Sequence, residues 1–138
     1  MAKTVPFKLI TPTQVAFEGD AELVIGVGTE GEEGILASHA PFLTALRPGI
    51  LRANVVAAGE TKRLEFATSE GFLQALPDRV TVLTDAALRR EEIDVDVARK
   101  ELQAAEERQR GLTPQSAEYA REQSAIDFAN ARIALASH

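Results

Sequence analysis

The sequence predicts an α+β protein in two segregated parts: an N-terminal antiparallel β-sandwich followed by a C-terminal antiparallel two-helix hairpin. In residues 5–86, short apolar runs alternate with turn signals, which is typical of an all-β sandwich or barrel. Residues 87–138 contain one Pro and one Gly and are rich in the helix formers Ala, Glu, Gln and Arg. No helix-length periodic segment interrupts the first part, which disfavours a parallel βαβ sheet. We therefore expect two domains, residues 1–86 and residues 87–138.

The predicted strands are short and follow one another closely. Turn signals separate several of them, because Gly, Pro and Asp favour the backbone conformations of tight turns. These signals stand at residues 11–12, 18–20, 58–60 and 76–78. The strands are expected at Val5–Ile10, Val15–Phe17, Ala21–Val27, Phe42–Leu46, Ile50–Val56, Leu64–Ala67, Gly71–Leu76 and Val80–Leu83.

The second part is predicted to form two helices, at about residues 94–110 and about residues 114–136. Gly111 suits the position just past a helix end. Thr113 suits an N-cap and Pro114 the first helical position. Because the connection is so short, the two helices should be antiparallel neighbours.

Both predicted helices carry apolar faces. The second helix has two: Tyr119, Ile126 and Ile133 recur every seven residues, while Phe128 and Leu135 point to nearly the opposite side. This other face either packs on the sandwich or is kept for a partner or for an alternative position of the hairpin. Much of the apolar surface is alanine, which contributes little burial, so we expect a lightly anchored hairpin. The first helix has one face, formed by Val95, Ala98, Leu102 and Ala105.

Composition excludes several classes of function. The net charge of −6 over 138 residues disfavours a nucleic-acid or anionic-membrane partner. The chain has no Cys and only two His, so neither a disulfide framework nor a structural zinc site is expected. Its apolar stretches are shorter than the roughly 18 residues of a membrane span, and residues 1–6 lack a hydrophobic targeting core, so we expect a soluble protein.

No catalytic constellation is expected either. Apart from the terminal Ser137-His138, Ser38 and His39 are the only close Ser/His pair, and neighbours in a β segment point to opposite faces. Gly26–Gly31 matches G-x-G-x-x-G by letter, but no helix follows to bind a phosphate. Glu30, Glu32 and Glu33 lack the spacing of calcium ligands and predict a solvated acidic turn. We expect no metal and no enzymatic activity of the chain by itself.

Two colinear segments resemble a known family. Gly31–Gly49 combines an acidic glycine-containing start with an apolar run between two Pro residues, and Glu70–Ala86 follows with a second matching run. Both resemble signature segments of the epsilon subunit of bacterial-type rotary ATP synthases. The chain departs from the pattern at Ala37-Ser38, where the family has Pro-Gly. The resemblance runs from about Phe7 to the end and weakens after Asp94.

The resemblance implies a non-catalytic subunit of the central stalk, at the cytoplasmic face of the bacterial inner membrane. It would link the gamma subunit to the membrane c-ring and so couple proton flow to ATP synthesis. By match to the family motif, Glu30, Gly31 and Glu32 should face the c-ring, and His39 should lie near the stalk. In the family, the hairpin switches between folded and extended states. The extended hairpin reaches the alpha and beta subunits and inhibits ATP hydrolysis.

Two further expectations concern the charges of the hairpin. Residues 115–138 hold two Arg against three acidic residues, so we expect weak electrostatic attachment to an acidic partner and weak inhibition. On the solvated face, Glu106 and Arg110 should pair at i,i+4.

Nucleotide binding remains a separate question. Some family members bind ATP through an Ile-Asp-x-x-Arg-Ala motif, and here Asp94 matches, while Arg99 supplies an arginine only after a shift of two residues. Asp94 can instead cap the helix. We expect no bound cofactor. An ATP-sensing regulatory module and a general β-sandwich adaptor are the alternative functions.

Overall fold

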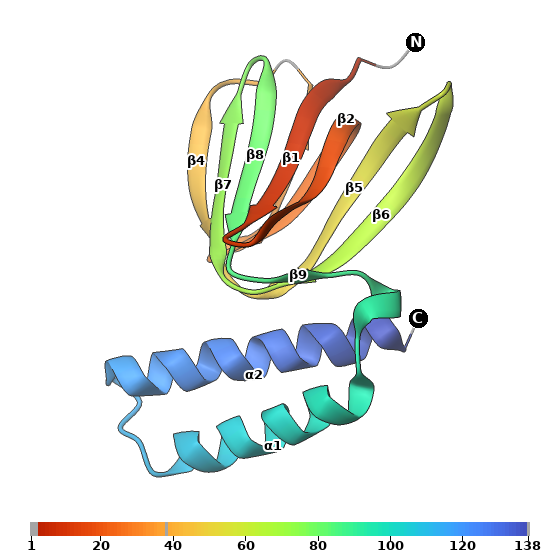
Figure 1. Ribbon diagram of the computed structural model, residues 1–138. Coiled ribbons are helices and arrows are strands. Elements are labelled where there is room, and N and C mark those ends of the chain that lie inside the picture. Colours follow the sequence, from red (N-terminus) through yellow and green to blue (C-terminus); the bar gives the residue numbers. More distant parts are fainter. Residues whose placement is uncertain (1–2, 38, 138) are drawn as a thin grey trace.

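The computed structural model describes residues 3–37 and 39–137. A β-sandwich lies on a pair of antiparallel helices, with the second helix between the sandwich and the first (Figure 1). This confirms the predicted fold class. The strands are β1 Val5–Thr11, β2 Gln14–Gly28, β3 Gly31–Leu36, β4 Phe42–Leu46, β5 Gly49–Ala57, β6 Glu60–Thr68, β7 Gly71–Leu76, β8 Arg79–Thr84 and β9 Ala87–Leu88. A 3-10 turn, η1 Arg90–Glu92, leads to α1 Val95–Arg110 and α2 Ala117–Ala136.

The sandwich has two layers joined by one long strand. β4, β7, β8 and β1 pair in one layer, and β5, β6 and β9 pair in the other. The first half of β2 pairs with β1 and its second half with β5 and β3, so β2 belongs to both layers. β1 pairs with β8 in parallel, so the sandwich is not antiparallel throughout as predicted. β1 and β8 are far apart in the sequence, and no tight turn between them imposes an antiparallel direction.

The predicted turn at residues 18–20 is wrong, because β2 continues through it. Gly19 pairs with Phe7 in the ladder between β1 and β2. A Cβ atom at Gly19 would lie 2.9 Å from Cζ of Phe17, so glycine makes room for that ring. The rings of Phe17 and Phe7 are 5.7 Å apart between centroids and pack at the edge of the core. Gly19 therefore serves packing rather than a change of direction.

The acidic segment is also more regular than predicted. Glu32 and Glu33 stand on β3, and only Thr29 and Glu30 form the turn that precedes it. Ile35 on this strand is 4% exposed and pairs with Val24 in β2. Burial of Ile35 fixes the register of β3, which leaves the glutamates in a strand at the edge of the sheet.

The core of the sandwich is aliphatic with a few phenylalanines. Side chains alternate inward and outward along each strand, as expected for sheets with one solvated face. The largest fully buried side chains of the sandwich are Phe7, Phe66, Leu9, Leu51, Leu73, Val5, Val24, Val80 and Val82. Ala87 of β9 also belongs to this core, so the sandwich uses residues as far as β9.

Helix α1 starts where the sequence predicts, and helix α2 starts later. The carboxylate of Asp94 accepts a hydrogen bond of 3.2 Å from the amide of Val97 and caps α1. α2 begins at Ala117 rather than Pro114, because the hydroxyl of Ser116 accepts from the amide of Tyr119 at 3.1 Å. Residues 113–116 instead form a turn closed by the Ser116 amide on the Thr113 carbonyl.

The two helices are joined by polar contacts as well as by alanine packing. Arg108 donates from Nε to Glu122 at 2.9 Å, whereas the expected pair of Glu106 with Arg110 is absent from the ion pairs between described residues. The hydrogen bond and then the charge of Glu122 raise the pKa of Arg108 above its ordinary value. Arg132 pairs with Glu101 of α1 at 2.5 Å.

The second apolar face of α2 packs on the sandwich. Leu135 and Ala131 of α2 and Ala67 of β6 form a small buried cluster of their own. Phe128 borders it, as expected for a residue on the same face as Leu135. The sequence left open whether this face packs on the sandwich or is kept for a partner or for another position of the hairpin. In the structure it packs on the sandwich. Among the described helices, none is long and apolar enough to cross a membrane.

Candidate interaction surfaces

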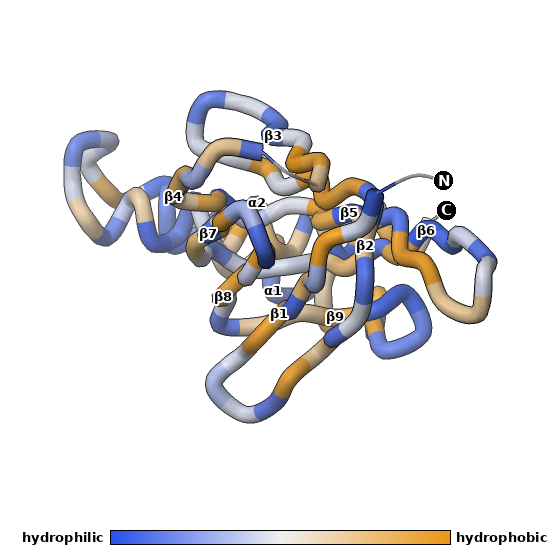
Figure 2. Tube along the Cα trace, turned by 90° about the horizontal axis from the view of Figure 1, so that it is seen from above, coloured by the Kyte–Doolittle hydropathy of each residue, from blue (hydrophilic) through white to orange (hydrophobic). Residues whose placement is uncertain are grey.

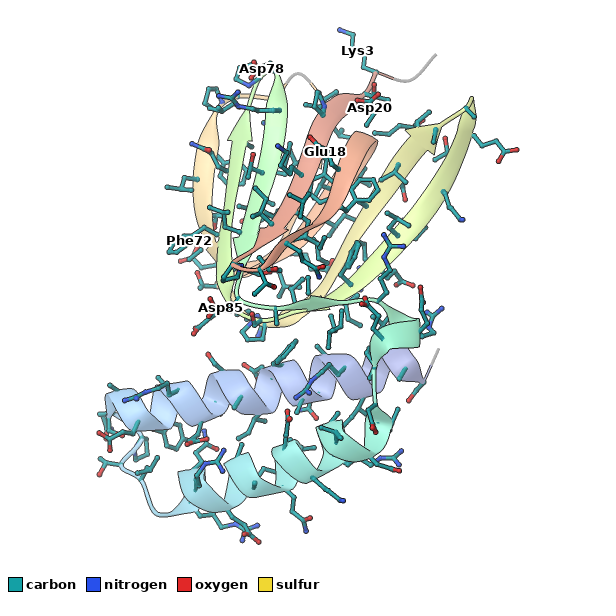
Figure 3. The ribbon with its side chains drawn as sticks, in the orientation of Figure 1. Lys3, Glu18, Asp20, Phe72, Asp78 and Asp85 are labelled. Carbon is teal, nitrogen blue, oxygen red and sulfur yellow. The ribbon has the colours of Figure 1, made fainter. Side chains whose placement is uncertain are left out.

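The outer face of one layer carries an uncovered line of apolar side chains, which we call the apolar row. Successive residues of the row are partners in the strand ladders, so their side chains share one face. Phe72 is 55% exposed, Leu83 49% and Val15 52%. Figure 3 shows Phe72 on the outer side of the sandwich. The row consists of Ala45, Phe72, Leu83, Ile10 and Val15, from β4, β7, β8, β1 and β2.

Alternation along the strands produces this row. Leu73, Val82 and Leu9 are fully buried, so their neighbours Phe72, Leu83 and Ile10 must face outward. Large apolar side chains grouped on a surface mark a site of interaction more often than scattered ones do. Figure 2 shows how apolar and polar residues alternate along these strands.

Polar groups border the apolar row. A hollow of about 320 Å³ beside Phe72 and Leu83 is edged by Glu70 and Asp85. A groove of about 630 Å³ lies over β1 and β8, where Lys8 and Glu18 form an ion pair of 3.3 Å. An apolar centre with a polar rim is the usual arrangement of a protein–protein interface.

The acidic residues expected to face the c-ring lie together at the turn between β2 and β3. Glu30 is exposed in the turn, and Gly31 has a φ of +134°, which only glycine adopts without strain. Glu32 is also engaged within the chain, since Nη1 of Arg52 on β5 lies 3.2 Å from its Oε2 atom. The turn lies near the end of the sandwich on which the helices pack, because Val27, just before it, lines one hollow together with Asp127 and Ala131 of α2.

His39 lies apart from this acidic turn. β3 separates them, with Gly31 at one end and Leu36 at the other, a span of about 17 Å at the usual strand rise. Nδ1 of His39 lies 2.5 Å from the carbonyl oxygen of Leu36, while Nε2 is buried without a partner among the described residues. The structure therefore groups Glu30, Gly31 and Glu32 but not His39. Ser38, considered as a partner of His39, lies outside the described residues.

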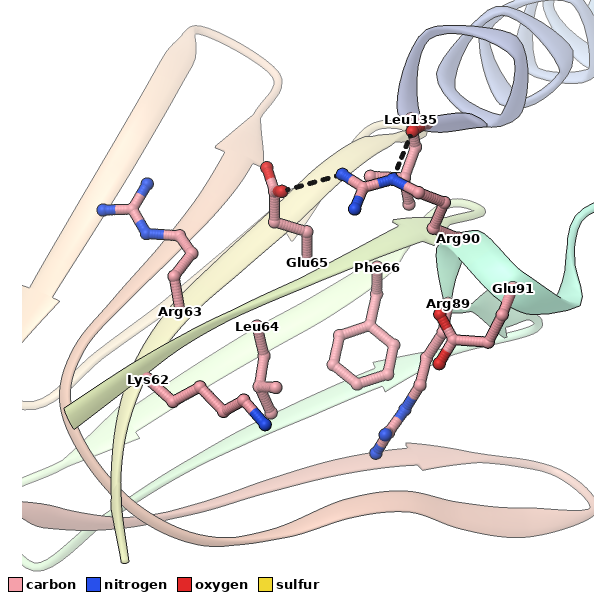
Figure 4. Close-up of a pocket in the computed structure, with 9 residues that line it drawn as sticks. All are labelled: Lys62, Arg63, Leu64, Glu65, Phe66, Arg89, Arg90, Glu91 and Leu135. Carbon is pink, nitrogen blue, oxygen red and sulfur yellow. Dashed lines mark hydrogen bonds and ion pairs between the residues drawn. The ribbon is translucent and has the colours of Figure 1, made fainter. Parts of the chain in front are cut away.

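Charged side chains connect the acidic strand to the end of α2. Arg52 lies between Glu32 and Glu65, at 3.2 Å and 4.0 Å. Arg90 reaches Glu65 at 3.4 Å and donates from Nε to the carbonyl oxygen of Leu135 at 3.0 Å (Figure 4). Sequence reasoning missed this chain of contacts. The contact of Arg52 with Glu65 was predictable from the sequence. A two-residue turn at residues 58–59 sets the register of β5 against β6, and this register pairs Arg52 with Glu65.

The residues considered for ATP do not form a site together. The Asp94 carboxylate is occupied as the cap of α1, and Arg99 is exposed on the same helix. Within the described chain, no group of three or more His, Asp or Glu side chains could hold a metal ion.

A β-sandwich that exposes an apolar row and carries a docked helical hairpin is typical of a subunit that binds other proteins. Residues 4–90 match the family model of the ATP synthase delta/epsilon chain β-sandwich domain. The epsilon chain of Ruminiclostridium cellulolyticum is 40% identical over 126 residues, which cover 91% of this chain and 90% of that one. The epsilon chain of Shouchella clausii is 38% identical and covers 98% and 96%. The chain therefore belongs to the ATP synthase epsilon chain family, whose members are non-catalytic subunits.

Solved structures share the fold. A chain in the Euglena gracilis mitochondrial ATP synthase assembly of OSCP, F1 and c-ring aligns with a TM-score of 0.75 at 24% identity, covering 98% of this chain and 82% of that one. A chain in the central stalk and c-ring structure of the Tetrahymena thermophila mitochondrial ATP synthase aligns with a TM-score of 0.65 at 18% identity, covering 94% and 97%.

Proposed function

We propose that the chain is a rotor subunit of a proton-translocating ATP synthase. In this role it sits in the central stalk, links the gamma subunit to the c-ring, and transmits torque without making or breaking bonds. It acts at the cytoplasmic face of the bacterial inner membrane and meets the membrane only through the complex. Family membership supports this function more than it supports a free-standing nucleotide sensor or a general adaptor.

The apolar row is the observation that carries the proposal. A subunit that transmits torque needs a partner fixed firmly to its sandwich, and burial of apolar area supplies that attachment. Phe72 and Leu83 are about half exposed in the chain by itself. We propose that the gamma subunit binds the apolar row.

Binding of the purified chain to purified gamma subunit tests this function. A one-to-one complex that survives gel filtration is expected, with no comparable complex with alpha–beta heads alone. If the chain binds neither, the rotor function is wrong, and the family likeness reflects ancestry only.

The acidic turn is proposed to face the polar loops of the c-ring. Glu30 and Glu32 give it a negative edge, suited to basic loops, and such complementarity favours orientation and association rate more than affinity. His39, at the other end of β3, is proposed to lie near the stalk without contacting the gamma subunit, since its Nδ1 already faces the carbonyl oxygen of Leu36.

Neutralising Glu32 should weaken coupling without unfolding the sandwich. For Glu32→Gln we expect proton-driven ATP synthesis in reconstituted vesicles to fall by about two- to threefold, because an exposed ion pair is worth at most about 1 kcal/mol. The melting temperature should change by about 3 °C or less. Glu60→Gln, an equally conservative change at the exposed first residue of β6, is the matched control. Normal synthesis in Glu32→Gln would count against the c-ring contact.

The hairpin is proposed to regulate hydrolysis by leaving its dock and reaching the alpha and beta subunits. The charges that α2 exposes indicate that its electrostatic attachment to the alpha and beta subunits is weak. Arg132 is 8% exposed and already paired with Glu101, so it is removed from the charges a partner could meet. Arg121 is then the exposed arginine that α2 presents. A single cation gives little electrostatic attraction.

ATP is not proposed as a ligand. Since the Asp94 carboxylate caps α1 and no arginine occupies the position of the family motif, the bidentate phosphate contact is missing. Calorimetric titration of the isolated chain with millimolar ATP, without magnesium, should give only heat of dilution. A saturable heat that Arg99→Ala abolishes would reverse this conclusion.

A further inference from the structure

The contact between hairpin and sandwich is small, so single polar interactions can govern it. Its buried centre consists of Leu135 and Ala131 from α2 and Ala67 from β6, with Ile50, Ile93 and Phe128 partly buried against them. This contact buries little apolar area compared with the core of the sandwich, which contains many more buried side chains. A contact of this size is open to control by neighbouring charges.

Arg90 makes two polar contacts here, while Ser124 of α2 makes a further one, from its hydroxyl to Glu70 at 3.2 Å. Nε of Arg90 donates to the carbonyl oxygen of Leu135 at 3.0 Å, and its Nη2 lies 3.4 Å from Glu65 on β6 (Figure 4). The last turn of α2 has no basic side chain of its own. The carbonyl groups at a helix C-terminus carry partial negative charge and are stabilised by a nearby cation. Arg90, from η1, supplies that cation only while α2 is docked.

Arg52 approaches the other oxygen of the same carboxylate. Glu65 receives Arg90 at Oε1, at 3.4 Å, and Arg52 at Oε2, at 4.0 Å, so a closer approach of Arg52 would draw the carboxylate away from Arg90. Arg52 is nearer to Glu32, at 3.2 Å. While Glu32 holds Arg52, Glu65 is free to orient Arg90 toward Leu135.

We propose that Glu32, Arg52, Glu65 and Arg90 form a latch that holds the hairpin on the sandwich and that is released when Glu32 engages an external cation. Loss of Glu32 lets Arg52 move onto Glu65, which weakens the hold of Glu65 on Arg90. Contact of the acidic turn with its partner thereby favours release of α2. The latch itself is a property of the isolated chain, and only the identification of the external cation as a c-ring loop rests on the proposed function.

Thiol labelling of the full-length chain tests the latch. The sequence has no Cys, so the only thiol that can be labelled is the one introduced by substitution. Ala67→Cys places it under α2, where it is 0% exposed and reacts only when the hairpin leaves. Under rapid reclosing, the labelling rate is proportional to the undocked population. Ala75→Cys, 0% exposed in the sandwich core, reports opening of the sandwich in parallel.

Arg90→Ala should increase labelling at Ala67→Cys about tenfold, the effect of losing a hydrogen bond to a charged donor. Labelling at Ala75→Cys should stay within about twofold. Arg90→Lys should fall between wild type and Arg90→Ala, because lysine lacks the planar fork that meets two acceptors. Arg121→Ala removes an exposed arginine from α2 itself and should leave the rate unchanged.

The competition predicts effects of opposite sign. Glu32→Gln should raise labelling at Ala67→Cys by about two- to threefold, and Arg52→Gln should lower it by a similar factor, as expected for partly exposed ion pairs. Glu32→Gln should have no further effect in the Arg52→Gln background. High salt should reduce both effects.

Two results would overturn the latch. One is Arg90→Ala labelling no faster than Arg121→Ala. The other is a change of the same sign for Glu32→Gln and Arg52→Gln. Because no other subunit is present, these results are independent of gamma binding, so failure of the latch and failure of the rotor function are distinguishable.

Discussion

Replacing Leu83 by Glu is expected to weaken binding of the chain to the gamma subunit by a factor of about 100 or more. Leu83 is in the middle of the apolar row, between Phe72 and Ile10, where a partner would exclude water. A carboxylate there would be buried without a cation, and an uncompensated buried charge costs several kcal/mol. The side chain points away from the core, so the fold should persist.

The matched control for this change is Leu36→Glu. Leu36 is 62% exposed, also stands on a strand, and lies in β3 rather than in the apolar row. The same substitution there should leave gamma binding within about threefold. Binding constants from interferometry and melting curves of both variants provide the comparison. An equal loss of affinity for the gamma subunit in both variants would mean that the added charge, and not its position in the apolar row, decides binding.

Replacing Leu135 by Ala is expected to release the hairpin. Leu135 is 0% exposed and is the largest side chain of the docked cluster. Truncation of a buried leucine to alanine costs about 2–5 kcal/mol. Since this cost falls almost wholly on a small contact, the undocked population should rise by a factor of about 30 or more. The labelling rate at Ala67→Cys measures this rise directly.

Val97→Ala is the control for the loss of an aliphatic side chain. Val97 is 44% exposed on α1 and forms no part of the dock. Its truncation should leave labelling at Ala67→Cys within about twofold. In the assembled ATP synthase, Leu135→Ala should also lower the rate of ATP hydrolysis, because the released hairpin is then free to reach the alpha and beta subunits that it is proposed to inhibit. Unchanged labelling would show that Leu135 does not hold the hairpin.

Local signals in the sequence were sufficient for the general form of the molecule. Gly111 ends α1 where predicted, because helix ends depend on nearby residues. Burial of Ala98 and Ala105 follows the predicted helical spacing. Phe128 and Leu135 were placed on a second face of α2 from spacing alone, and that face packs on the sandwich.

The errors arose where one residue type suits two local structures, or where contacts distant in the sequence decide. Gly19 signals a turn locally, but the ring of Phe17 needs the space over it. Pro114 suits a helix start, but the hydroxyl of Ser116 satisfies the first amides of α2 instead. Arg90 and Leu135 are 45 residues apart, so no local pattern indicates that they meet.

The candidate surfaces were predictable only in part. The family motif suggested Glu30 and Glu32 as an interaction site, which stays a prediction; the structure places them beside each other where β3 begins, while His39 lies at the other end of β3. The apolar row required the register of β4, β7, β8, β1 and β2, which depends on the parallel pairing of β1 with β8. Sequence alternation gives the outward residues of each strand but not which strands lie side by side.

Photo-cross-linking from the apolar row tests the central claim most directly. A benzophenone amino acid in place of Phe72, in the assembled ATP synthase, should form a covalent adduct with the gamma subunit on irradiation. The same group in place of Leu36 should form no gamma adduct. Mass spectrometry of the adducts identifies the partner in both cases. If Phe72 gives no gamma adduct, or Leu36 gives an equal one, the apolar row is not the site at which this subunit joins the rotor.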